Sequence, residues 1–231
     1  MLLLIWNVSD VLILSPHTDD MELGAGGTVR LLVQSGARVK SVVLSDCRKS
    51  VDTTKYPEDI LRKECLAAAK HLGIDDLTIL SFPVRELPEH RQEILETLYG
   101  IRKDREFDLV ITSWWGDTHQ DHRTLAEETQ RAFMRTSSTV LSYAIPGSCS
   151  DFVPNVFVPL TEDDVKKKIE MLRLYESQVA KRDYFQTDAI KAFLTYQGIH
   201  VGRPYAEAFA QHRTVVKGFS AGGIPGRPRS R

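Results

Sequence analysis

Short apolar runs alternate with amphipathic segments over the first 145 residues, and this alternation restricts the possible folds more than any other feature. Segments with apolar residues three or four apart, such as Leu61, Cys65 and Ala68, have the spacing of one helix face. The apolar runs between them are short and continuous, as expected of strands buried on both faces. They lie at residues 11–14, 39–45, 77–80, 109–111 and 140–143. The alternation predicts an α/β, Rossmann-like fold, with a mostly parallel sheet and helices on both faces.

The last third of the chain departs from this rhythm. Residues 156–160 predict one more strand, and the apolar spacing from Thr161 to Val179 predicts a long amphipathic helix capped by Thr161. We interpret this part as an elaboration packed on the same sheet, so that residues 1–220 form a single domain. The Gly, Pro, Ser and Arg residues of 221–231 predict a disordered tail.

Composition argues against several classes of function. The formal net charge of −1 gives no broad attraction for nucleic acid or anionic membranes. No apolar stretch is long enough to span a bilayer, and the apolar start of the chain lacks a basic region and a cleavage site. The 3 cysteines lack C-x-x-C spacing, which argues against a disulfide framework or a thiolate zinc site. We expect a cytoplasmic protein without nucleic-acid or membrane partners.

Two polar clusters directly follow predicted strands. The first is Pro16-His17-Thr18-Asp19-Asp20, after the strand at 11–14, and the second is Asp117-Thr118-His119-Gln120-Asp121-His122, after the strand at 109–111. Ligands of open α/β sheets bind at the carboxyl ends of the strands. Imidazoles and carboxylates without sulfur suit zinc or another divalent ion, and three protein ligands would leave one position open for water.

Each cluster by itself has a simpler interpretation. Asp19 or Asp20 could cap a helix that begins near Glu22, and His119 and His122 could be capping or solvated residues at the start of another helix. Capping would have to explain the two clusters separately, whereas a metal site explains both. Their joint placement at two strand ends of one sheet therefore favours the metal site.

The same residues resemble the motifs of the PIG-L/LmbE family of metal-dependent N-deacetylases. The resemblance rests on P-H-T-D-D followed by G-x-G-G, and on D-x-H-Q-D-H about a hundred residues later. Further similarities are Y-E-S-Q at 175–178 and Y-A-E-A-F at 205–209, so the resemblance extends from about Val11 to Phe209. It implies an LmbE-like, Rossmann-like fold. It also implies a hydrolase that removes the acetyl group from an N-acetylated sugar of the N-acetylglucosamine type, or from a related small glycoconjugate.

Carried over position by position, the resemblance implies one divalent metal ion, zinc or sometimes another, held by His17, Asp20 and His122. Asp19 would be the general base that takes a proton from the attacking water. His119 would stabilise the oxyanion, and Asp121 would hold a neighbouring histidine in the right tautomer and orientation.

Three more residues are expected to contact the substrate. Arg62 matches a family position that can face the sugar. Trp115, just before the second cluster, could stack on a sugar ring, and Tyr143 is a similar case after the fifth strand; core packing is the alternative for both. Thr18 stands where the family most often has proline. Because members of the family often assemble, a homo-oligomer is also an expectation.

Two other functions remain open alternatives. A nucleotide-binding Rossmann protein would use Gly24-Ala25-Gly26-Gly27, with Asp46 at roughly the ribose-binding distance. However, the third spaced glycine is missing and Asp19, Asp20 and Glu22 stand where a pyrophosphate would lie. A non-catalytic sugar-binding protein would fit if the metal were only structural, although an open coordination position argues against it.

Overall fold

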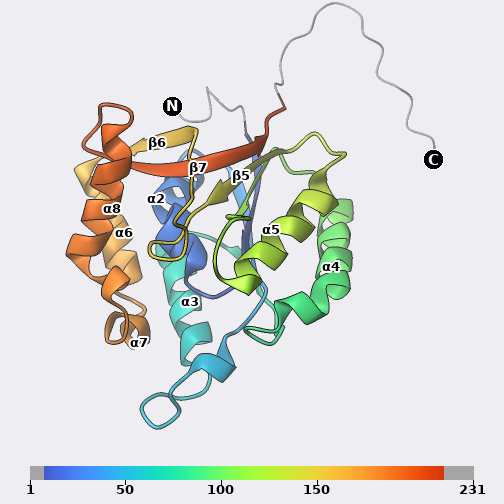
Figure 1. The fold of residues 1–231 in the computed structure, drawn as a ribbon, viewed down its shortest axis with the longest axis horizontal. Helices are drawn as coiled ribbons and strands as arrows, with labels where there is room; N and C mark the ends of the chain where they lie inside the picture. Colours follow the sequence, from blue (N-terminus) through green and yellow to red (C-terminus); the bar gives the residue numbers. More distant parts are fainter. Residues whose placement is uncertain (1–7, 216–231) are drawn as a thin grey trace, which may run out of the picture.

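A seven-stranded sheet forms the centre of the molecule (Figure 1). The computed structural model describes residues 8–215, so the tail expected at 221–231 lies outside the described residues. In their order across the sheet, the strands are β3 (Asp76–Ile79), β2 (Arg38–Val43), β1 (Asp10–Ser15), β4 (Leu109–Ser113), β5 (Thr139–Tyr143), β7 (Tyr205–Arg213) and β6 (Val156–Leu160). The first five are parallel, and β7 pairs antiparallel with both β5 and β6. The expected α/β fold with a mostly parallel sheet is confirmed.

Helices cover both faces of this sheet, and alternate residues of β1 show why. Val11 and Ile13 join one hydrophobic core, whereas Leu12 and Leu14 join a second core on the opposite face. On the first face lie α2 (Asp20–Gln34), α3 (Ile60–Leu72), α6 (Glu162–Leu172) and α8 (Thr187–Ile199). On the second face lie α4 (Arg91–Asp104) and α5 (Gln120–Phe133). Short helical turns complete the chain at η1 (Arg48–Ser50), η2 (Leu87–His90), α7 (Glu176–Val179) and η3 (Asp183–Phe185). No helix within residues 8–215 is long and apolar enough to cross a membrane.

The last third differs from the expected pattern in two ways. The helix expected from Thr161 to Val179 begins where predicted, because Thr161 and Asp164 form a capping box. It ends at Leu172, and α7 starts only after Tyr175, whose hydroxyl donates to the carbonyl of Thr18 and to Glu22. Neither β7 nor α8 was predicted from the sequence. Strand β7 alternates small alanines with Tyr205, Glu207, Phe209 and Gln211 and therefore lacks the continuous apolar run that marks the other strands.

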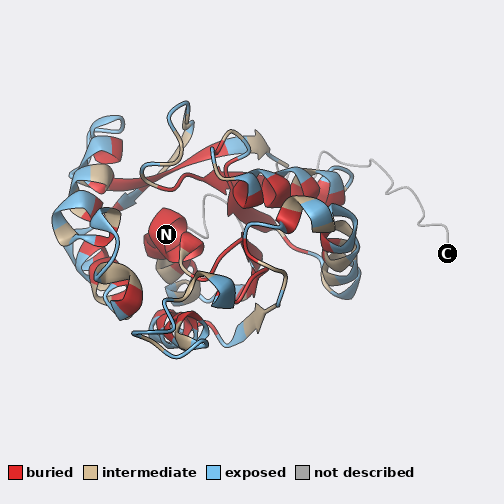
Figure 2. Ribbon diagram, turned by 60° about the horizontal axis from the view of Figure 1, so that its bottom comes forward, coloured by how far each residue is buried: buried red, intermediate tan, exposed pale blue. Residues whose placement is uncertain are grey.

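Helix α2 is mostly buried and begins at Asp20 (Figure 2). Gly24 and Gly26 allow it to lie close to its neighbours. A Cβ added at Gly24 would lie 2.3 Å from the ring of Tyr143, and one at Gly26 would lie 2.6 Å from Met171. The close approach requires glycine at Gly24, because the buried ring of Tyr143 cannot move aside as the flexible end of Met171 can.

A buried ion pair fixes α2 to the last third of the chain. Lys168 and Glu207 lie 2.5 Å apart, and each side chain is 1% exposed. Lys168 also donates to the carbonyl of Leu23 at 2.6 Å, while Glu207 accepts from the backbone N–H groups of Gly27 and Thr28 at 2.8 and 2.6 Å. The run of three lysines at 166–168 therefore includes one fully buried side chain, that of Lys168.

Replacing one partner of this pair should destabilise the fold strongly. Lys168→Ala leaves Glu207 buried without its counter-charge, which typically costs about 3–5 kcal/mol. Lys167→Ala removes the neighbouring lysine, whose ion pair with Glu170 is solvent-exposed, and should cost less than about 1 kcal/mol. Denaturant unfolding of both variants measures the difference. Equal stabilities would contradict a structural role for the buried pair.

Candidate metal centre

Two loops meet at one edge of the sheet and carry the polar clusters. Residues 16–19 connect β1 to α2, and residues 114–119 connect β4 to α5. β1 and β4 are parallel neighbours, so their carboxyl ends lie side by side. The strand order also reverses between them, since the chain continues outward from β1 through β2 and from β4 through β5. Such a reversal leaves a crevice between the two loops, where α/β proteins bind their ligands.

Three side-chain atoms form a nearly equilateral triangle in this crevice. Asp20 Oδ2 lies 3.1 Å from His17 Nδ1 and 3.4 Å from His122 Nε2, and the two nitrogens are 3.2 Å apart. A tetrahedral zinc ion with bonds of about 2.0–2.1 Å separates its ligand atoms by about 3.3 Å. The triangle therefore fits one face of a zinc tetrahedron, and its nitrogen and oxygen donors are of the type that divalent zinc prefers.

A carboxylate lies behind each of the two histidines. The Nε2 of His17 is 2.9 Å from Asp121, and the Nδ1 of His122 is 2.7 Å from Asp117. Each contact orients one ring and leaves its other nitrogen at the triangle, as outer carboxylates commonly do for histidine ligands. Asp121 thus contacts a histidine of the other cluster. The contact of Asp117 was missed, although Asp117 opens the second motif, because sequence alone does not show which side a loop carboxylate faces.

The ionisation states of His17, Asp20 and His122 depend strongly on one another. Burial lowers the pKa values of His17 and His122, but the neighbouring carboxylates, with Asp20 first among them, outweigh burial and raise them to about 9 and about 10. Burial also opposes ionisation of Asp20, yet the two histidines hold the pKa of its carboxyl well below its usual range. The carboxylates thus make this crevice attractive to cations, whether protons or a divalent ion.

Asp19 and His119 lie beside the triangle and line the same cavity. Asp19 precedes α2, but its side chain makes no capping hydrogen bond. Burial, together with the charge of Asp20, raises its pKa to about 6. His119 caps α5, because its Nδ1 accepts from the backbone N–H of Asp121 at 3.2 Å. Burial and the adjacent histidines lower the pKa of His119 to about 4, so its ring is neutral with the proton on Nε2.

His17, His119 and His122 also form a set that could hold a metal, but its geometry is less suitable. Their ligand nitrogens span up to 4.8 Å, which is wider than the separation of about 3.3 Å around a tetrahedral zinc ion. In addition, His119 already uses Nδ1 to cap α5. The set with Asp20 fits one ion better and leaves His119 beside it.

The cavity over these residues has a volume of about 590 Å³, within the range of small-molecule sites. Cys47 also lines it, and burial raises the pKa of its thiol to about 12. A protonated thiol is a poor nucleophile and a poor metal ligand, so Cys47 contributes to the wall of the cavity only.

The structure does not bring the three expected substrate contacts to this cavity. Tyr143 is fully buried, and its hydroxyl donates to the carbonyl of Leu14 at 3.1 Å. Trp115 packs on His212, with ring centroids 3.8 Å apart, and does not line the cavity. Arg62 lines a neighbouring cavity that also includes Asp46. Sequence position alone could not show whether these side chains line the cavity or pack elsewhere.

Comparison with known proteins connects this site to a family. The family model described as "PIG-L: GlcNAc-PI de-N-acetylase" matches residues 12–133. A diacetylchitobiose deacetylase of Thermococcus kodakarensis is 29% identical, covering 87% of this chain and 82% of that protein. The uncharacterized deacetylase YaiS of Escherichia coli is 27% identical, covering 72% and 90%. The solved N,N'-diacetylchitobiose deacetylase of Pyrococcus horikoshii superposes with a TM-score of 0.75 at 23% identity, covering 89% of this chain and 84% of that one.

The contact between Asp117 and His122 can be tested through metal affinity. Asp117→Asn preserves the size of the side chain but removes the charge that orients His122. Zinc affinity should fall by about 10- to 100-fold, the usual effect of losing such an outer carboxylate. Competition with a chromogenic chelator measures the affinity, and Asp104→Asn, at the exposed end of α4, is the matched control. Wild-type affinity in Asp117→Asn would contradict this role.

Proposed function

This chain belongs to the PIG-L family, and on that premise we propose that it is a metal-dependent deacetylase acting on an N-acetylated sugar of the N-acetylglucosamine type. The observation that carries the proposal is the triangle of His17, Asp20 and His122 at the floor of a cavity large enough for a sugar. The similarity to a curated diacetylchitobiose deacetylase supports the choice of an acetamide as the bond that is hydrolysed.

We propose that the triangle holds one divalent ion, with zinc as the best fit to its size and donors. The bound ion would supply Lewis-acid chemistry, by lowering the pKa of a water molecule to about 7 and by polarising the acetyl carbonyl. Asp121 and Asp117 keep the two histidine rings in the orientation that this requires. The backbone N–H of His17, 2.9 Å from Oδ2 of Asp20, holds the third side chain in place.

Asp19 is the proposed general base. Its carboxylate lines the cavity next to Asp20 and is not used to cap α2, so it is available to a ligand. It would accept a proton from the attacking water and return it to the nitrogen of the leaving amine. The two adjacent carboxylates then have different roles, since Asp20 belongs to the triangle and Asp19 faces the substrate.

His119 is the proposed donor to the acetyl oxygen. Because its Nδ1 accepts from the backbone of α5, its N–H lies on Nε2 and is free to donate into the cavity. Negative charge develops on the acetyl oxygen as water attacks the carbonyl carbon. A fixed donor at this point stabilises the transition state more than the bound substrate.

The packing of the glycines argues against the nucleotide-binding alternative. Gly24 and Gly26 face the side chains of Tyr143 and Met171, and Gly27 faces Leu160. They therefore allow α2 to pack closely, and do not form a phosphate-binding turn. The non-catalytic alternative is distinguished by acetate release, because a sugar-binding protein would not release acetate.

Acetate release separates these functions. The zinc-loaded protein should release acetate from N,N'-diacetylchitobiose, and removal of the metal by a chelator should abolish the activity. Asp19→Asn should lower kcat by about 10²–10⁴-fold, the usual contribution of a general base, while retaining zinc. His17→Ala should lose zinc as well as activity.

Elemental analysis of the same samples distinguishes variants that lose activity but keep zinc from variants that lose zinc. Asp104→Asn should behave as wild type in both measurements. Zinc binding without acetate release from any N-acetylated sugar would favour a binding protein. Full activity in a metal-free sample would contradict the proposal.

A further inference from the structure

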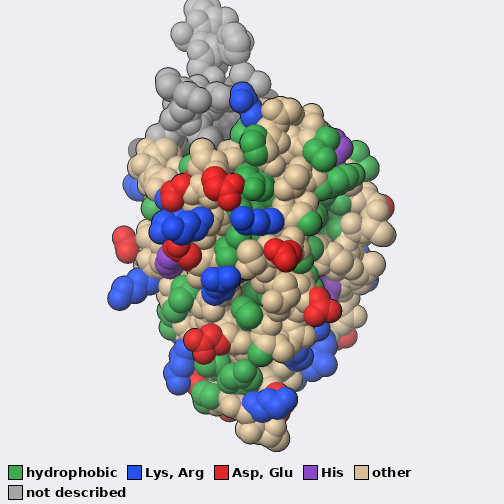
Figure 3. Space-filling model, turned by 90° about the vertical axis from the view of Figure 1, so that its left-hand side faces the viewer, with side chains coloured by type: hydrophobic (Ala, Val, Ile, Leu, Met, Phe, Trp, Pro, Cys, Tyr) green, Lys and Arg blue, Asp and Glu red, His purple; other side chains and the backbone are tan. Residues whose placement is uncertain are grey.

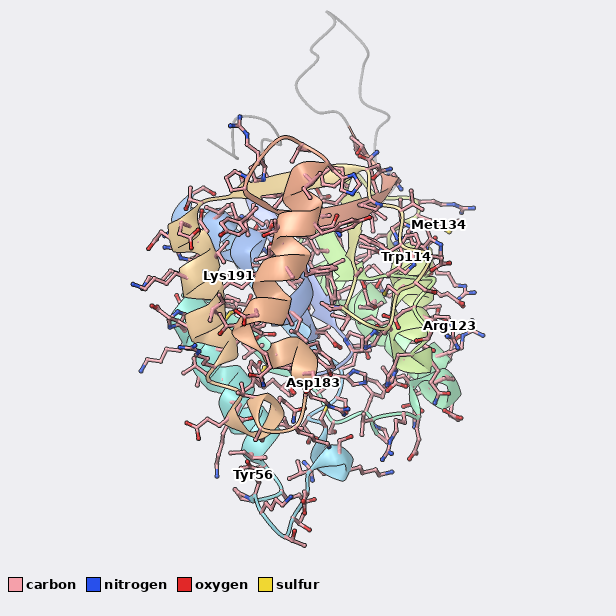
Figure 4. All side chains as sticks on the ribbon, turned by 60° about the vertical axis from the view of Figure 1, so that its left-hand side comes forward. Tyr56, Trp114, Arg123, Met134, Asp183 and Lys191 are labelled. Atoms are coloured by element: carbon pink, nitrogen blue, oxygen red, sulfur yellow. The ribbon has the colours of Figure 1, made fainter. Side chains whose placement is uncertain are left out.

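Basic side chains gather around the cavity above the candidate metal centre. Four of them line its wall: Lys49, Arg85, Lys181 and Arg182. They come from separate segments, since Lys49 lies in η1, Arg85 in the loop between β3 and η2, and the other two in the turn between α7 and η3. Figure 4 labels Asp183, which marks the position of that turn. Positive charge therefore approaches the cavity from more than one side.

Three of the four cations have no carboxylate partner. Lys49 forms an ion pair with Glu86 at 2.7 Å, and Asp52, an acidic residue of the same wall, pairs with Lys55 at 3.3 Å. Within residues 8–215, no ion pair involves the side chains of Arg85, Lys181 and Arg182. The nearest polar contact of the Arg85 guanidinium is the carbonyl of Lys49 at 3.5 Å. These three groups leave uncompensated positive charge at the mouth of the cavity.

Arg85 is tied to the candidate metal centre through its backbone. It has a φ of 71°, in the left-handed region that residues other than glycine seldom adopt. Its N–H donates to Asp121 Oδ2 at 2.6 Å, and its carbonyl accepts from the side chain of Gln120. The same Asp121 contacts His17. The strained backbone of Arg85 is thus held at a fixed place relative to the triangle, as often occurs at functional sites.

The rest of the surface does not share this excess of positive charge. The chain as a whole has a formal net charge of −1. On the face formed by α6 and α8, basic and acidic side chains are interspersed (Figure 3). Lys191 pairs there with Glu162 and Lys167 with Glu170, whereas no ion pair within residues 8–215 involves the exposed Lys166. Unpaired cations thus also occur outside the cavity, but Arg85 and the pair Lys181 and Arg182 come from separate segments and line one cavity.

From these observations, and resting on the proposed function, we propose that the natural substrate is an N-acetylated sugar that carries an anionic group. Arg85, Lys181 and Arg182 bind this phosphate or carboxylate at the mouth of the cavity while the acetamide lies at the triangle. Guanidinium groups bind phosphates and carboxylates through paired N–H donors, and lysine adds a point charge. The anion supplies binding energy away from the reacting bond and so distinguishes this substrate from neutral sugars.

Matched substrates test the proposal directly. Zinc-loaded protein is assayed for acetate release from methyl N-acetylglucosaminide, from the N-acetylglucosaminide of glycolic acid, and from the 1-phosphate and 6-phosphate of N-acetylglucosamine. At least one anionic compound should have a kcat/KM about tenfold above that of the methyl glycoside. The glycolate and the phosphates distinguish a carboxylate from a phosphate. Raising the salt concentration should reduce the advantage of the anion.

The double variant Lys181→Gln/Arg182→Gln shows whether the advantage comes from the proposed residues. Its KM for the preferred anion should rise about tenfold, while its kcat/KM for the methyl glycoside should fall much less. Lys191→Gln, on α8 and outside the cavity, is the control (Figure 4). Equal use of neutral and anionic substrates, or an equal loss for both in the double variant, would overturn the proposal.

Calorimetry separates failure of this inference from failure of the proposed function. If none of the four compounds releases acetate, the proposed deacetylation is wrong for these sugars, but anion binding is still measurable. Glucosamine 1-phosphate should bind more tightly than methyl glucosaminide, and the double variant should lose the difference. Indistinguishable affinities for these two ligands would overturn the anion site independently of any activity.

Discussion

The parallel pairing of β1 with β4 is the constraint on which the candidate site depends. Val11 pairs with Leu109 and Ile13 with Ile111, so both strands end at the same edge of the sheet. The loops that follow are about a hundred residues apart in sequence, yet they bring His17 and His122 within 3.2 Å of each other. A shift of one residue in this register would turn the side chains of a strand to the opposite face. The two-sided hydrophobic core around β1 prevents such a shift, and packing far from the crevice thereby sets the geometry within it.

Helix α2 connects the packing of the sheet to the candidate site. Its first residue, Asp20, belongs to the triangle, and its body is buried between the sheet and α6. The N-terminus of a helix carries partial positive charge, which favours the ionised carboxylate of Asp20. Glu207 accepts two backbone N–H groups of the helix, and Tyr175 holds the carbonyl of Thr18 in the preceding loop. Thr18 stands where the family most often has proline, so contacts from a distant helix fix a loop that proline would restrict locally.

The sequence was sufficient to predict the parallel strands and both polar clusters, because continuous apolar runs and loop motifs are local signals. It did not predict β7, since the alanines of this strand alternate with larger residues of mixed polarity and form no continuous apolar run. Lys168 appeared solvated within a run of lysines, and only the distant Glu207 explains its burial. Tyr143 and Trp115 have the side chains of a sugar site, but their direction depends on tertiary packing. Local pattern thus located the two polar clusters that meet in the crevice, whereas long-range packing determined which other residues surround them.

The pair of Lys168 and Glu207 has a consequence for the order in which the protein matures. The residues of the triangle lie in the first 122 positions, but the strand that secures α2 is the last element of the sheet in sequence. Contacts between distant parts of a chain form late in folding, and synthesis proceeds from the N-terminus. A chain still on the ribosome therefore lacks the strand that fixes α2, and Asp20 with it, until its final third has emerged. The triangle of His17, Asp20 and His122 then reaches its final geometry only after β7 has joined the sheet.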